Sequence, residues 1–326
     1  MPALAPLRFE PIFQSMLWGG NRLPGFVRRP APTTDPIGEA WMLSDVDGRV
    51  SVVAEGPLAG RSLRDVLAEF SAEMFGSTVP ADGRFPLLFK FLDARKALSV
   101  QVHPDDAQAL ALHGPGHRGK TEAWVILDAD PRASRLYAGF RAGETAESFR
   151  VAMAAGTTAE TLHAFTPKAG DCLFLEAGTV HAIGAEILLF EVQQTSDITY
   201  RLYDWDRVDA KTGLPRELHV DRGLACSNFA AGPRNPVVPR SVGDRHELVA
   251  CPHFTLHRRG GDKPMSAGEP GRCRVVVAVE GRGSIAGEPF RTGDVVLLPA
   301  SLGTVRIVPD GPLQFLEIGL GEGAGC

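Results

Sequence analysis

Polar and apolar side chains alternate in the segment SVQVHPDD, at residues 99–106. Ser99, Gln101 and His103 are separated by single valines, which is the period of a β-strand, so the three polar side chains point to one face. An amide and an imidazole that face the inside of a barrel need polar partners, and a metal ion would satisfy both. The same alternation also fits a half-exposed strand whose polar face meets water.

Two further residues complete a set that could bind a metal. Glu122 stands at the start of the apolar run EAWVIL, and His181 follows a glycine-containing turn in AGTVHAIG. Imidazole, carboxylate and neutral oxygen ligands together suit a divalent first-row metal, with zinc favoured, and they leave positions open for water or substrate. We therefore predict a catalytic site with one Zn²⁺ per chain, held by Gln101, His103, Glu122 and His181.

The same residues also have a purely structural interpretation. His103 and His181 would then be hydrogen-bonded histidines of a core or rim, and Glu122 would form an ion pair with Lys120. Spacing alone does not decide between the two interpretations, because only Gln101 and His103 lie close together in the sequence.

An internal repeat favours the metal site. The segment AGDCLFLEAGTVHAI resembles TGDVVLLPASLGTVRI, with Gly170 aligned to Gly293. Eleven residues further on, His181 in the first copy corresponds to Thr304 in the second. The shared scaffold therefore does not require a histidine at this position, so a structural role for His181 becomes less convincing.

The elements that must position these residues are mostly short strands. The chain has 36 glycines and 25 prolines, which separate many short apolar runs, as in sandwiches and barrels. Helical spacing predicts a helix over residues 61–76 and a helical excursion over residues 146–165. Residues 121–140 are predicted to form a hairpin whose turn is DADPRA. We therefore expect a mainly β fold.

The chain is long enough for two domains. At 326 residues, two units are expected, and the Pro-, Gly- and Arg-rich stretch at 230–247 is typical of a boundary. We predict a catalytic unit over residues 1–235, with helical excursions, and a second β unit over residues 247–326. The tail GEGAGC, at residues 321–326, is expected to be disordered.

Charge and cysteine content limit the possible binding partners and the cellular compartment. The formal net charge is −5 without blocks of like charge, which argues against nucleic acid or an anionic membrane as the main partner. No apolar run approaches the roughly 20 residues of a membrane span. The scattered cysteines form no CxxC motif and fit a reducing cytoplasm. We expect a cytoplasmic protein, monomeric or homodimeric, that acts on a small molecule.

Several ordered motifs resemble one enzyme family. They are FKFLDARKALSVQVHPDD, GKTEAWVIL, AGTVHAIG and EVQQTSDITYRLYDWDR, with SMLWGGNRL and GEAWMLS nearer the start. Together they closely resemble the mannose-6-phosphate isomerases in their shorter bacterial form, over about residues 10–215. The resemblance implies a tandem cupin, with two jelly-roll β-barrels, a small helical insertion, and metal in the first barrel only. It also implies that the family's zinc ligands match Gln101, His103, Glu122 and His181.

The family interconverts mannose 6-phosphate and fructose 6-phosphate by moving a proton between C1 and C2 through an enediol. Arg201 resembles the family's active-site arginine, and its guanidinium can stabilise an enediolate or hold phosphate but cannot act as a base. Lys120 resembles a lysine of the pocket. Glu191 and Asp197 match acidic residues near the site, and either is a base, an orienting group or a turn cap. Lys90 matches a family lysine whose role we do not assign.

Other interpretations stay open. Arg201 could pair with Asp204 or Asp206 at the surface, and Lys90 could extend to a sheet edge. Rival functions are a cupin isomerase or epimerase on another sugar phosphate, an iron dioxygenase, and a non-catalytic sugar-binding cupin. The presence of the complete ligand set together with Arg201 and Lys120 argues against a protein that only binds sugar.

Overall fold

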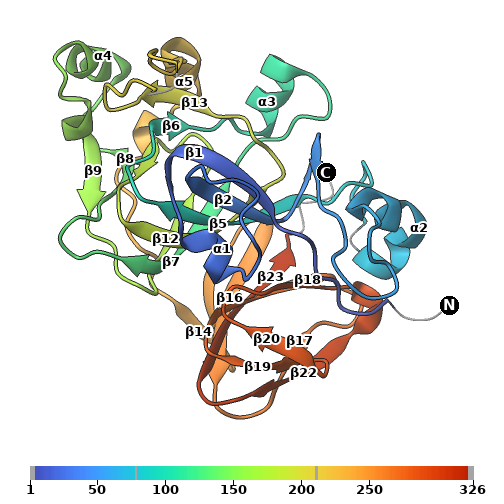
Figure 1. Cartoon of the computed structure of the whole chain (residues 1–326). Coiled ribbons are helices and arrows are strands. Elements are labelled where there is room, and N and C mark those ends of the chain that lie inside the picture. Colours follow the sequence, from blue (N-terminus) through green and yellow to red (C-terminus); the bar gives the residue numbers. More distant parts are fainter. Residues whose placement is uncertain (1–3, 78, 210–211, 322–326) are drawn as a thin grey trace.

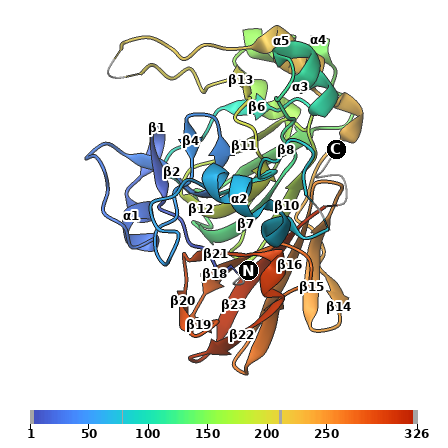
Figure 2. The same ribbon diagram turned by 90° about the vertical axis from the view of Figure 1, so that its right-hand side faces the viewer.

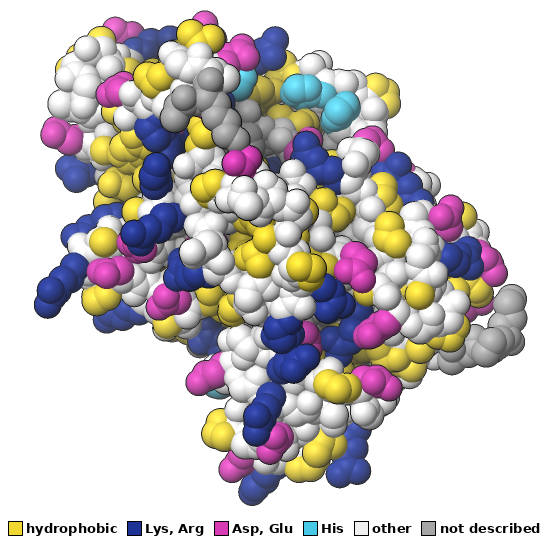
Figure 3. All heavy atoms as spheres, viewed as in Figure 1, with side chains coloured by type: hydrophobic (Ala, Val, Ile, Leu, Met, Phe, Trp, Pro, Cys, Tyr) yellow, Lys and Arg dark blue, Asp and Glu magenta, His cyan; other side chains and the backbone are white. Residues whose placement is uncertain are grey.

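The computed structural model describes residues 4–77, 79–209 and 212–321. The chain folds into two jelly-roll barrels joined side by side, so the prediction of a mainly β tandem cupin is confirmed (Figure 1). Basic and acidic side chains are mixed over the face seen in Figure 3. Among the described residues, no helix is long and apolar enough to cross a membrane. The tail after residue 321 lies outside the described residues.

The first barrel consists of two antiparallel sheets. In spatial order, its six-stranded sheet contains β1 (Ile12–Gly20), β2 (Ile37–Leu43), β5 (Leu87–Ala94), β12 (Ile187–Gln194), β7 (Glu122–Ala129) and β10 (Cys172–Leu175). Its five-stranded sheet contains β13 (Tyr200–Tyr203), β6 (Val100–Val102), β11 (His181–Ile183), β8 (Leu136–Phe140) and β9 (Leu162–Phe165). A small ribbon of β3 (Asp45–Val46) and β4 (Arg49–Val50) lies beside them.

The second barrel repeats this plan. Its six-stranded sheet contains β14 (Arg240–Val242), β15 (Arg245–Ala250), β16 (Phe254–Gly261), β23 (Leu313–Leu320), β18 (Arg274–Glu280) and β21 (Val295–Leu298). Its four-stranded sheet contains β17 (Met265–Gly268), β22 (Thr304–Pro309), β19 (Arg282–Ile285) and β20 (Glu288–Arg291). We propose the domain division at 1–235 and 247–326, with the β14–β15 hairpin added to the second unit.

The register of the two six-stranded sheets extends the repeat to single residues. Glu191 of β12 lies opposite Lys90 on one side and Trp124 on the other. In the second barrel, Glu317 of β23 lies in the same way between His257 and Val276. Glu317 is therefore the counterpart of Glu191.

Two residues further along the same strands, the two barrels differ in the residues that lie opposite each other. Gln193 lies opposite Glu122 in the first barrel, whereas Gly319 lies opposite Arg274 in the second. A guanidinium thus takes the place of a carboxylate, and a guanidinium has no acceptor for a metal ion. Apart from the buried ion pair of Arg259 and Glu317, the second interior is filled by an apolar cluster that includes Phe290 and Phe315.

Short helices connect the strands of these two barrels. They are α1 (Arg22–Phe26), α2 (Leu63–Phe75), α3 (Asp106–His113), α4 (Ala146–Ala154) and α5 (Val220–Cys226), with 3₁₀ turns η1 (Thr158–Thr161), η2 (Phe229–Ala231) and η3 (Ala300–Leu302). Helix α2 confirms the expected helix over residues 61–76. It starts at a capping box between Ser62 and Asp65 and ends at Gly76, whose φ is 65°. Helices α3, α4 and α5 gather at one end of the first barrel (Figure 2).

The hairpin predicted over residues 121–140 is wrong. β7 and β8 are strands, but β7 pairs with β12 and β10, whereas β8 pairs with β11 and β9 in the other sheet. The turn between them is held by the carboxylate of Asp130, which accepts hydrogen bonds from the backbone of Arg132 and Ala133. Such a turn serves a hairpin or a crossing between sheets equally well, and the partners of each strand decide which one forms.

The two six-stranded sheets pack against each other and form a core shared by both barrels. Phe89 and Phe190 contribute from the first barrel, and Phe254 and Leu316 from the second. All eight residues of β5 and of β12 are consequently buried, because one face meets the second barrel and the other faces the first barrel's interior. A charged side chain on these strands must therefore find its partners inside the protein.

We expect Phe254→Ala to destabilise both barrels together. Its side chain is fully buried in the shared core, and such truncations cost about 3–5 kcal/mol of unfolding free energy. Calorimetry should show one transition at a lower temperature. Phe290→Ala, inside the second barrel alone, is the matched control for loss of a buried ring. Two separate transitions in Phe254→Ala, with the first barrel unchanged, would contradict a shared core.

Candidate metal centre

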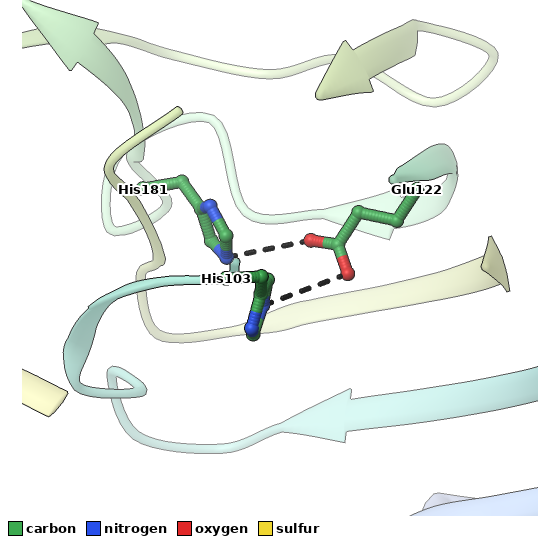
Figure 4. Close-up of side chains that lie close together, drawn as sticks. All are labelled: His103, Glu122 and His181. Carbon is green, nitrogen blue, oxygen red and sulfur yellow. Dashed lines mark ion pairs between the residues drawn. The ribbon is translucent and has the colours of Figure 1, made fainter. Parts of the chain in front are cut away.

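The candidate metal residues come from both sheets of the first barrel. Across the five-stranded sheet, Arg201 of β13 lies opposite Gln101 of β6, which in turn lies opposite His181 of β11. His103 follows β6 directly and points the same way as Gln101. Glu122 begins β7 in the facing sheet, so the cluster lies between the two sheets. The two imidazoles and the carboxylate converge as Figure 4 shows.

The cluster is compact and buried. His181 Nε2 lies 3.3 Å from Glu122 Oε1, and His103 Nε2 lies 3.8 Å from Glu122 Oε2. All three residues are only 1–2% exposed, and one ligand atom from each lies within 4.8 Å of the others. Three donors at such short separations can contact one cation simultaneously.

The hydrogen bonds of the two imidazoles prepare them as ligands. His103 Nδ1 lies 2.9 Å from the carbonyl oxygen of Ile198, and His181 Nδ1 lies 2.8 Å from that of Thr179. A carbonyl only accepts, so each Nδ1 carries the proton and each Nε2 turns a lone pair toward the cluster. Burial, with help from the Lys120 ammonium, lowers the pKa of His181 to about 3 and that of His103 well below its ordinary value. Both rings are therefore neutral near pH 7, the form that binds metal.

The carboxylate is equally suited to a cation. Glu122 Oε1 is buried and has no hydrogen-bond partner. Burial raises the pKa of Glu122 to about 7, so its negative charge needs compensation. An orphaned carboxylate oxygen beside two imidazole lone pairs fits a divalent cation, so this donor set agrees with the predicted metal site.

Gln101 and Lys120 border the same cluster. The Gln101 amide lies 3.3 Å from His181 Nε2, and rotation of the amide brings either its oxygen or its nitrogen there. Lys120 Nζ lies 3.0 Å from His103 Nε2 and forms an ion pair with Glu122 Oε2. The ion pair of the structural interpretation is thus present, but it leaves Glu122 Oε1 and His181 Nε2 available.

A cavity of about 350 Å³ opens beside the cluster, and it brings the remaining predicted residues together. Its lining includes Gln101, Lys120, Glu191, Asp197 and Arg201, of which Lys120 and Glu191 are buried and Asp197 is exposed. Of the candidate metal residues, Gln101 lines this cavity. His103, Glu122 and His181 are not part of its lining and are joined to it through their contacts with Gln101 and Lys120.

Glu191 lies in the wall of this cavity. Its Oε2 accepts a 3.0 Å hydrogen bond from the indole of Trp124, while its Oε1 has no hydrogen-bond partner. Burial opposes ionisation of Glu191, but the ammonium groups of Lys120 and Lys90 outweigh it and lower the pKa of this carboxyl group. Asp197, in contrast, is exposed at the rim, 3.6 Å from Arg49.

Arg201 does not form the surface ion pair that the alternative interpretation expected. Its Nη1 donates a 2.7 Å hydrogen bond to the carbonyl oxygen of Glu217, and its Nε is buried without a partner. Asp204 pairs instead with Arg207 and Arg216. Arg201 therefore keeps donor capacity directed to the cavity.

Sequence reasoning missed several residues of the cavity. Glu39, Trp41, Arg49 and Arg216 line it, and Lys90, which had no assigned role, lines it as well. The only available signal was the motif GEAWMLS, which contains Glu39 and Trp41 but shows no pattern that distinguishes it from an ordinary strand. Lys90 does not extend to an edge, because it is only 6% exposed.

A jelly-roll barrel that holds two buried imidazoles and a carboxylate beside a cavity lined by charged groups defines a cupin enzyme with a candidate metal centre. Comparison with known proteins gives the family. A model described as phosphomannose isomerase type I, catalytic domain, matches residues 7–123. The chain is 37% identical to mannose-6-phosphate isomerase ManA of Bacillus subtilis over 310 residues, 93% of this chain and 95% of that protein.

Two further comparisons agree. The chain is 36% identical to the mannose-6-phosphate isomerase of Streptococcus mutans over 318 residues, 95% of this chain and 97% of that protein. The crystal structure of the mannose 6-phosphate isomerase from Bacillus subtilis matches with a TM-score of 0.85 at 28% identity, over 97% of this chain and 99% of that one. The chain belongs to the mannose-6-phosphate isomerase family, which confirms the predicted family and enzyme class.

We expect His181→Ala to abolish metal retention while the fold stays largely intact, because the equivalent position of the second barrel has no histidine. Mass spectrometry of the dialysed protein measures metal retention, and the melting temperature shows whether the fold is intact. Thr304→Ala, the matched change in the second barrel, should retain metal fully. Unfolding of His181→Ala would mean that this histidine is structural.

Proposed function

We propose that the chain is a zinc-dependent aldose–ketose isomerase that interconverts mannose 6-phosphate and fructose 6-phosphate through an enediol. The observation that carries this proposal is the buried cluster of His103, Glu122 and His181, whose contacts with Gln101 and Lys120 connect it to a cavity that Glu191 also lines. The curated relatives named mannose-6-phosphate isomerase support the substrate.

His103, Glu122 and His181, with Gln101, would hold the zinc. Two neutral imidazoles and a carboxylate are a common catalytic zinc set, and an amide oxygen is compatible with it. When bound, the metal supplies a positive charge that polarises the substrate oxygens at C1 and C2.

We assign the proton transfer to Glu191. Glu191 lines the cavity, its Oε1 has no hydrogen-bond partner, and its lowered pKa keeps the group ionised near pH 7, the form that can accept a proton. Glu191 would remove the proton from C2 of the open-chain aldehyde of mannose 6-phosphate and return it to C1, while the hydroxyl proton of O2 passes to O1, which leaves the ketone at C2. Asp197 is a weaker candidate, because it is exposed at the rim of the cavity. Lys120, whose ammonium lies 3.8 Å from Glu191 Oε1, would stabilise the negative charge that develops on the substrate oxygen.

Arg201 is our candidate for the phosphate. Its Nε is a buried donor without a partner, and the planar guanidinium matches phosphate oxygens. Arg49 and Arg216 also line the cavity and add positive charge, although each already has a carboxylate partner, Asp197 and Asp204 respectively.

We also propose a cytoplasmic location. The four described cysteines, Cys172, Cys226, Cys251 and Cys273, are free, which supports a reducing compartment. The state of association, monomer or homodimer, stays a prediction.

We expect the purified protein to produce fructose 6-phosphate from mannose 6-phosphate in a coupled assay. Activity should disappear after chelator treatment and return with added zinc, because the proposed chemistry needs the cation. Mannose without phosphate is the matched control substrate and should react poorly. A protein of confirmed metal content that shows no activity would contradict this function and leave an epimerase, a dioxygenase or a sugar-binding cupin.

We expect Arg201→Ala to raise the KM for mannose 6-phosphate by about 10- to 100-fold, because one charge-assisted hydrogen bond to the phosphate is lost. The kcat should change much less, since phosphate is held equally in the ground and transition states. Arg150→Ala removes an exposed arginine of α4 that lies outside the cavity lining and serves as the control. A fall in kcat at constant KM would instead mean that Arg201 stabilises the enediolate.

A further inference from the structure

A row of four side chains crosses the central strands of the first barrel. Trp41 of β2 lies opposite Lys90 of β5, Lys90 lies opposite Glu191 of β12, and Glu191 lies opposite Trp124 of β7. Directly opposed residues of a sheet share one face, and this face is the barrel interior. The row thus places an ammonium and a carboxylate side by side between two indoles.

The ammonium group of Lys90 has two carboxylates and an aromatic ring as neighbours. Its Nζ lies 3.4 Å from Glu191 Oε1 and 3.4 Å from Glu39 Oε2, and it lies 4.9 Å from the centre of the Trp41 ring. Glu39 Oε2 in turn accepts a 2.6 Å hydrogen bond from Trp41 Nε1. Lys90 is therefore clamped from one side by Glu39 and Trp41, and its other side touches Glu191.

Glu191 receives its orientation from both neighbours of the row. The Trp124 indole donates to Oε2 at 3.0 Å, and the Lys90 ammonium lies next to Oε1. The only other ammonium close to Oε1 among the described residues is that of Lys120, at 3.8 Å. Without Lys90, one oxygen of this buried carboxylate would lose its nearest cation, and the side chain would be free to turn away from the cavity.

Lys90 could serve the reaction in two ways, by touching the substrate or by holding Glu191. Although Lys90 lines the cavity, its ammonium already contacts two carboxylates and an aromatic face, so the contacts favour the second role. We propose that Lys90, anchored by Glu39 and Trp41, is a positioning residue that fixes the orientation of the Glu191 carboxylate toward the substrate cavity. This inference rests on the proposed function, in which Glu191 transfers the proton.

The second barrel offers a matched control. Glu317, the counterpart of Glu191, forms a buried ion pair with Arg259 at 2.9 Å, and the two side chains are 2% and 5% exposed. Arg259→Met therefore removes a buried cation from the equivalent carboxylate, but in a barrel without the substrate cavity. It should lower the melting temperature and leave kcat unchanged.

The test is a double-mutant cycle with Lys90→Met, Glu191→Gln and both together, in zinc-loaded full-length protein. Lys90→Met should lower kcat about 10²-fold, within the range of a displaced acid–base group, while KM changes less than about threefold. The double variant should be no slower than Glu191→Gln alone, because Lys90 acts through Glu191. Lys90→Arg keeps the charge and should recover part of kcat, and Glu39→Gln should lower kcat less than Lys90→Met.

The results of these experiments distinguish a positioning role of Lys90 from direct action on the substrate. Additive losses of kcat, or a rise in KM alone, would mean that Lys90 acts on the substrate directly and would overturn the inference. If Lys90→Met does not fold, Lys90→Arg and Glu39→Gln carry the same test, and full activity in both overturns it. If the wild-type protein lacks isomerase activity, the proposed function fails. The contact between Lys90 and Glu191 can still be tested by the melting temperatures of the wild type, the two single variants and the double variant. Non-additive shifts in melting temperature support the contact, and additive shifts overturn it.

Discussion

The need to pair every buried charge governs the interior of the first barrel. Five charged side chains of alternating sign follow one another there: Glu39, Lys90, Glu191, Lys120 and Glu122. Three carboxylates face two ammonium groups, so the series carries one excess negative charge, at the end where His103 and His181 turn their lone pairs inward. A charge in a medium of low polarisability is tolerated only with compensation, and a bound cation would supply it here.

This arrangement depends on the second barrel. Because the two six-stranded sheets pack face to face, the central strands of the first barrel are buried on both sides and are held rigidly. Rigid strands can hold neighbouring charges at fixed separations, which a loop could not do as well. The second barrel has the same strand order in its six-stranded sheet, but Arg274 replaces the carboxylate of Glu122, and apolar side chains fill most of the interior beside the Arg259–Glu317 ion pair. One copy of the scaffold thus carries the chemistry, and the other supports it.

Much of the site could be predicted because its signals are local. The alternation around Gln101 and His103 indicated a polar face, and the exchange of His181 for Thr304 between the repeats indicated that the histidine is not needed by the scaffold. Lys90 could not be interpreted in the same way. A lysine within an apolar strand is compatible with an edge or with a pocket, and its partner Glu191 is about a hundred residues away in the chain.

The sequence by itself indicated most of the strands, the repeat, the candidate donor set and the family, since these follow from residue types, short spacings and ordered motifs. It did not indicate β9, because residues 162–165 end a segment that was predicted to be helical. Only the tertiary structure decided which strands are neighbours. It separated β7 and β8 into different sheets, and it aligned Trp41, Lys90, Glu191 and Trp124 in one row. The physical reason is that backbone hydrogen bonding can join many pairs of strands, whereas burial of the apolar faces of the whole chain selects one set of partners.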